Sequence, residues 1–69
     1  WLCTWEKLWL AERGDPDTAA LALAKVAQAR DMTSYRQLPA AERATVEADI
    51  AKARAGDASG FTAYAAVHC

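Results

Sequence analysis

Apolar side chains recur at helical spacing along most of the chain, and no segment shows the strict alternation of a β-strand. The first ten residues carry the strongest pattern, with every tryptophan of the chain in one stripe. We predict a helix over residues 2–13, ended by Gly14 in a left-handed conformation. Its apolar face and edge comprise Trp1, Leu2, Trp5, Leu8, Trp9 and Glu12. A neighbouring strip carries Cys3, Glu6, Lys7, Leu10 and Arg13.

A second helix is predicted over residues 16–30. Asp15 precedes it as an N-cap, and Pro16 suits its first turn. Alanine dominates the segment, which favours a helix and permits close approach of a neighbour. Because the turn after residue 13 is very short, the first two helices should form an antiparallel hairpin.

Residues 31–38 break this pattern and form a connector anchored by Tyr35 and Leu38. A third helix is predicted over residues 39–55, with Gly56 as its stop. Its core side comprises Val46, Ile50 and Ala53, and its solvated face comprises Glu47, Asp49, Lys52 and Arg54. Asp57 or Ser59 should cap a short fourth helix, residues 61–69. The sequence therefore predicts one all-α domain over residues 1–69, a small bundle of three main helices plus a short C-terminal helix that returns against the first.

The two cysteines, Cys3 and Cys69, lie near opposite ends of the chain. We expect one disulfide between them, which would close a loop of nearly the whole chain and add about 4.4 kcal/mol on the loop-entropy model. Such a bond implies an oxidising compartment, and hence a secreted or exported protein. The alternative is two free thiols in a cytoplasmic protein.

The tryptophans allow two interpretations. Hydrophobic residues make up 54% of the chain, but about half of these are alanine, so large rings are needed to fill a core. Tryptophan also dominates the energetics of protein interfaces. We expect the stripe to be mainly core with Trp1 partly exposed. Any binding surface for another protein should draw on Trp1, Trp5, Trp9 and Leu10.

No pattern predicts a catalytic, cofactor or metal site. Cys3, His68 and Cys69 offer three zinc-type ligands, one short of a closed structural site. Glycines are too few and scattered for a phosphate-binding loop. The net charge is −1 without a basic run, which makes nucleic acid an unfavourable partner. The longest uncharged stretch, residues 58–69, is too short to span a bilayer.

These observations favour a non-enzymatic protein–protein interaction module. A membrane-active or antimicrobial-type secreted peptide is one alternative, supported by the tryptophan-rich end, the terminal cysteines and a first residue other than Met. A helical DNA-binding module is a second alternative, which would need Arg36, Arg43, Lys52 and Arg54 on one surface. The identity of a partner and the oligomeric state do not follow from the sequence.

Overall fold

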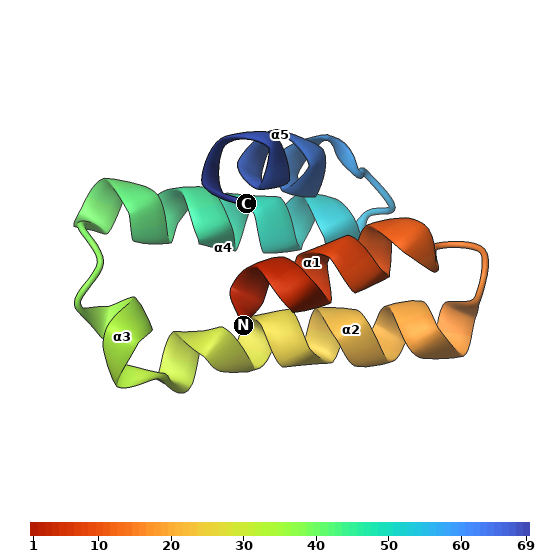
Figure 1. The fold of residues 1–69 in the computed structure, drawn as a ribbon, viewed down its shortest axis with the longest axis horizontal. Coiled ribbons are helices and arrows are strands. Elements are labelled where there is room, and N and C mark those ends of the chain that lie inside the picture. The colour runs from red at the N-terminus through yellow and green to blue at the C-terminus, as the bar shows by residue number, and fades with distance from the viewer.

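The computed structural model describes residues 1–69, is 80% helical and contains no strand. This confirms the all-α prediction. Figure 1 shows the α-helices, with a 3-10 turn, η1, between the second and the third. Their bounds are α1 (Leu2–Ala11), α2 (Pro16–Gln28), η1 (Ala29–Asp31), α3 (Thr33–Arg36), α4 (Ala40–Arg54) and α5 (Ser59–His68).

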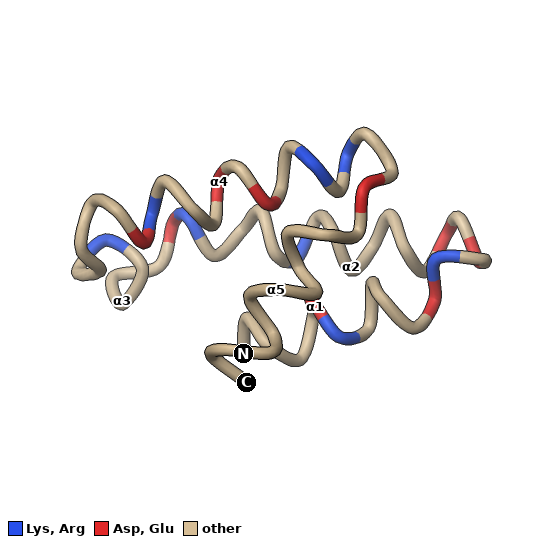
Figure 2. Tube along the Cα trace, turned by 90° about the horizontal axis from the view of Figure 1, so that it is seen from above, with Lys and Arg blue, Asp and Glu red and all other residues tan.

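Each long helix packs against at least one other. Helix α1 packs on α2, α5 packs on both α4 and α1, and α2 contacts α4. In Figure 1, α2 and α4 run along the long axis of the molecule, and the short α5 lies beside α4. Figure 2 shows the two ends of the chain close together. Cys3, near the first end, and Cys69, at the second, have their sulfur atoms at bonding distance, 2.03 Å.

The core is formed by bulky side chains set against alanines. Phe61 of α5 is fully buried and meets the Trp9 ring edge-on, with the ring centroids 5.3 Å apart. Two alanines, Ala22 and Ala53, belong to the same buried cluster as these rings, so small side chains stand beside large ones in the core. The buried cluster consists of Trp9, Ala22, Val26, Tyr35, Val46, Ile50, Ala53 and Phe61.

Two of the helix-end signals predicted from the sequence are confirmed, at the start of α2 and at the end of α4. The Asp15 side chain accepts hydrogen bonds from the backbone N–H groups of Asp17 and Thr18, at 3.2 and 3.4 Å, so it caps α2 as predicted. Gly56 has a φ of 84° and ends α4 in the left-handed region, also as predicted.

Two boundary predictions were wrong. Gly14 is not in the left-handed region; α1 ends at Ala11, and the N–H of Asp15 donates to the Glu12 carbonyl in an ordinary right-handed turn. Helix α5 begins at Ser59 rather than residue 61. Its N-cap is Ala58 rather than Asp57 or Ser59, and no side chain caps it. Asp57 Oδ1 accepts the Ser59 N–H at 2.9 Å in the turn just before the helix.

Candidate functional site

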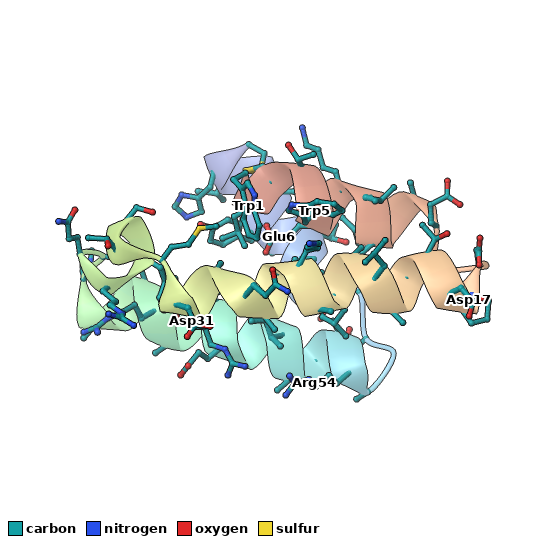
Figure 3. The ribbon with its side chains drawn as sticks, turned by 90° about the horizontal axis from the view of Figure 1, so that it is seen from below. Trp1, Trp5, Glu6, Asp17, Asp31 and Arg54 are labelled. Carbon is teal, nitrogen blue, oxygen red and sulfur yellow. A yellow bond between two sulfur atoms is a disulfide. The ribbon has the colours of Figure 1, made fainter.

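The tryptophan stripe of α1 divides into a buried and an exposed part. Trp9 is only 5% exposed and belongs to the core, so the prediction that it contacts a partner does not fit this fold. Trp5 is half-buried, with the Lys25 ammonium 5.9 Å from its ring centroid, and Leu10 packs against the core. Trp1 alone is largely accessible, at 51%. Figure 3 shows Trp1 and Trp5 side by side along α1, with ring centroids 6.1 Å apart.

Beside Trp1 lies an apolar groove of about 260 Å³. We call it the Trp1 groove; it is walled by α1, by the connector between α2 and α4, and by Tyr64 of α5. The Tyr35 hydroxyl donates to the Arg43 carbonyl at 3.2 Å and fixes the ring that forms one wall. The lining residues are Trp1, Leu2, Ala29, Met32, Ser34, Tyr35, Leu38 and Tyr64.

Two carboxylates that the sequence placed outside the core faces of their helices are buried. Glu6 of α1 is fully inaccessible, and neither of its side-chain oxygens has a hydrogen-bond partner. Asp49 of α4 is 5% exposed, and its Oδ2 is also without a partner. The prediction that Asp49 belongs to a solvated face was therefore wrong. It failed because α5 packs over this side of α4, where helical periodicity alone placed solvent.

Burial changes the acidity of this pair. Loss of hydration, followed by the nearby negative charge of Asp49, raises the pKa of Glu6 from 4.5 to about 7. Loss of hydration also raises the pKa of Asp49, against the opposing effect of the Lys52 ammonium. Glu6 therefore changes its protonation state near neutral pH.

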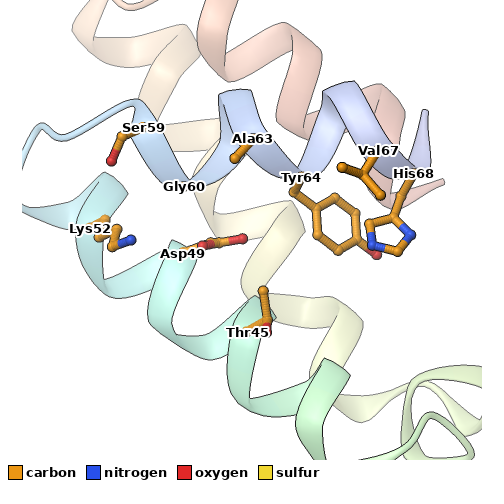
Figure 4. Close-up of a pocket in the computed structure, with 9 residues that line it drawn as sticks. All are labelled: Thr45, Asp49, Lys52, Ser59, Gly60, Ala63, Tyr64, Val67 and His68. Atoms are coloured by element: carbon orange, nitrogen blue, oxygen red, sulfur yellow. The ribbon is translucent and has the colours of Figure 1, made fainter.

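Asp49 forms the floor of a second and larger groove, about 520 Å³, between α4 and α5. We call it the Asp49 groove (Figure 4). Tyr64 and His68 stack along one end, with their ring centroids 4.4 Å apart and planes tilted by 32°. Tyr64 lines both this groove and the Trp1 groove, so the two adjoin at this side chain. The lining residues are Thr45, Asp49, Lys52, Ser59, Gly60, Ala63, Tyr64, Val67 and His68.

Gly60 is the point at which α5 crosses closest to α4. A Cβ at this position would lie 2.5 Å from Asp49 Oδ1 and 3.0 Å from the Asp49 Cα. Since a backbone atom is involved, a side-chain rotation cannot relieve the clash. The absence of a side chain at Gly60 is therefore what allows Asp49 to be covered.

We expect Gly60→Ala to lower the free energy of unfolding by about 1–3 kcal/mol, because α5 must move away from Asp49. Urea unfolding followed by circular dichroism measures this. Gly14→Ala is the matched control, because nothing lies within 4 Å of its Cβ position and its φ is not positive. Gly14→Ala should leave the free energy of unfolding unchanged or raise it slightly. Equal effects of the two substitutions would show that the α4–α5 approach is not as close as described.

The three zinc-type ligands that the sequence offered, Cys3, His68 and Cys69, do not form a metal-binding cluster in the structure. The sulfur atoms of Cys3 and Cys69 lie at bonding distance from each other. No cluster of three His, Cys, Asp or Glu side chains is placed to hold a metal ion. Sequence reasoning missed Glu6 and Asp49, although one signal was present. Every residue three or four positions from Glu6 is apolar or a cysteine: Leu2, Cys3, Trp9 and Leu10.

Comparison of the chain with protein-family models, with curated proteins and with solved structures finds no match. None of its helices has the length and apolar character needed to cross a bilayer. The two grooves and the buried carboxylates are therefore the features from which a function can be inferred.

Proposed function

We propose that the chain is a non-enzymatic protein–protein interaction module that docks its partner in the Trp1 groove. The observation that carries this proposal is the unequal burial of the tryptophans. Trp9 is used by the core, whereas Trp1 leaves half its surface at the edge of an apolar groove. Exposed tryptophans beside apolar grooves are typical centres of binding energy in interfaces.

The volume and the apolar lining of the Trp1 groove suit a single bulky side chain. Seven of its eight lining residues are hydrophobic, so it favours an aliphatic or aromatic group over a polar one. We infer that α1, α2, α4 and α5 act as one small bundle in which the Cys3–Cys69 pair holds α1 against α5. The walls supplied by Trp1 and Tyr64 would then keep a constant separation.

The pairing of Cys3 with Cys69 supports a secreted or exported location, because structural disulfides persist in oxidising compartments. No comparable observation supports either alternative, the membrane-active peptide or the DNA-binding module. Lys and Arg residues are interspersed with Asp and Glu along α4 (Figure 2), which offers neither DNA nor an anionic membrane a continuous basic surface.

The proposal is tested by site-specific photo-crosslinking in an extract of the producing organism, followed by binding measurements with the purified partner. A photoreactive residue replaces Trp1 or Met32 in the groove, and Leu21 as a control. Leu21 is 52% exposed, like Trp1, but lies on α2 outside both grooves. We expect one protein to be captured from the groove positions and not from Leu21.

The purified partner should bind Trp1→Ala at least about 30-fold more weakly than the wild type, as for an interface hot spot. Leu21→Ala should bind like the wild type. Because Trp1 is already half exposed, its removal should leave the unfolding midpoint nearly unchanged. Capture from all three positions alike, or unchanged affinity of Trp1→Ala, would refute docking in the Trp1 groove.

A further inference from the structure

We propose that the Asp49 groove binds the guanidinium group of a partner's arginine. The partner segment would place this arginine next to the bulky apolar residue that occupies the Trp1 groove. This inference rests on the proposed function and deepens it, because it specifies the chemistry of the partner at the neighbouring groove.

The first observation is the unsatisfied carboxylate of Asp49. It lines the groove and is more than nine-tenths buried, and neither of its carboxylate oxygens accepts a hydrogen bond. Because Oδ2 is closed to solvent, a ligand in the groove would donate to Oδ1. Leaving a buried carboxylate oxygen without a donor is costly, and a cation with N–H groups is the ligand that removes this cost. Lys52 lines the same groove and acts on Asp49 at longer range, but it makes no direct ion pair with this carboxylate.

The second observation is the aromatic end of the groove. Tyr64 and His68 stack there and present ring surface beside the carboxylate (Figure 4). A planar guanidinium can stack on such rings while donating to a carboxylate, and it is less strongly hydrated than an ammonium group. This combination favours arginine over lysine.

The surrounding charges agree with a cationic ligand. Loss of hydration and then the charges of three carboxylates, those of Glu6, Glu42 and Asp49, raise the pKa of the Tyr64 hydroxyl. The three carboxylates come from α1 and α4, and all act on the Tyr64 hydroxyl of α5. At this hydroxyl they act as negative charges, and Lys52 is the one Lys or Arg residue that lines the groove.

The third observation is the wall that the two grooves share. Tyr64 lines the Asp49 groove and the Trp1 groove, so a short segment can fill both. One apolar side chain would enter beside Trp1 and Met32, and a neighbouring arginine would cross Tyr64 to reach Asp49. Acidic or purely apolar segments would leave Asp49 unsatisfied and should bind more weakly.

The test uses two dipeptide probes, acetyl-leucyl-arginine amide and acetyl-leucyl-citrulline amide, titrated into the oxidised ¹⁵N-labelled protein. Citrulline has the shape of arginine without its charge. We expect the arginine probe to shift the amide resonances of Gly60, Ala63 and Tyr64 and to bind about fivefold or more tightly than the citrulline probe. The Asp49→Asn variant should remove this preference. Glu47→Gln, which removes an exposed carboxylate from the same helix, should retain it.

Each outcome decides between the two proposals. Equal binding of both probes, with shifts confined to Met32 and Leu38, would overturn the arginine site but leave the Trp1 groove as a docking site. A charge preference that survives in Asp49→Asn would also overturn the arginine site. Shifts at Gly60 and Ala63 with none at the Trp1 groove would support the arginine site and count against the proposed function. Failure of both probes to cause any shift would count against both grooves.

Discussion

Replacing both cysteines with serine is expected to lower the free energy of unfolding by about 4 kcal/mol. The pair lies 66 residues apart in the sequence, so without it the unfolded chain regains the freedom of a loop that spans nearly the whole molecule. A domain of this size has few kcal/mol to lose, since a small core buries a limited fraction of its surface. We therefore expect Cys3→Ser/Cys69→Ser to be partly unfolded at 37 °C.

Urea unfolding of the wild type with and without a reducing agent measures this effect. The reduced wild type should match the double serine variant in its unfolding midpoint, and its intact mass should rise by two hydrogen atoms on reduction. The reducing agent itself is controlled by treating the serine variant, whose midpoint should not move. A wild-type midpoint and mass that do not change on reduction would show that the cysteines are not bonded in solution.

The second large effect concerns pH. Between pH 5 and 8, the free energy of unfolding should fall by about 3 kcal/mol at most, because the pKa of Glu6 is raised from 4.5 to about 7 in the folded chain. Within this window the folded state binds more protons than the unfolded state. The stabilisation is complete below pH 4.5 and is lost as pH rises through 7. Asp49 of α4, with its own raised pKa, acts in the same direction, and the Tyr64 hydroxyl of α5 faces the same carboxylates.

Urea unfolding at half-unit steps from pH 5 to 8 measures how the free energy of unfolding changes with pH. Glu6→Gln should remove most of the pH dependence of the free energy of unfolding, because the amide keeps the shape of the protonated acid and cannot ionise. Glu47→Gln on the exposed side of α4 should keep the wild-type slope. If the wild-type stability were constant over this range, or if Glu6→Gln kept the slope, Glu6 would not be the buried titrating group.

The helices were predictable because their signals are local. Asp15 and Pro16 start α2, Gly56 ends α4, and the spacing of Val46 and Ile50 reveals a core face. The cysteine pair was also predictable, since only two cysteines are present. In these cases a few neighbouring residues, or a count, determine the outcome.

The candidate sites were less predictable because they depend on which helices cross. Trp1 and Trp9 follow the same periodicity, yet only Trp9 meets Phe61 from a helix 50 residues later. Asp49 has the sequence surroundings of a surface residue, and it is buried because Gly60 lets α5 approach. The Trp1 groove needs Met32 and Leu38 from a connector whose path no helical period describes.

The short distance between the two cysteines also determines how the protein would respond to a pulling force. Their Cα atoms are 5.9 Å apart, whereas the molecule is 33 Å long. With the bond in place, a pulling force applied at the two ends of the chain would pass directly from Cys3 to Cys69 through covalent bonds. The helices between them would carry none of the load. Under tension the oxidised domain would act as a short, inextensible link, and only reduction would allow force to unravel it.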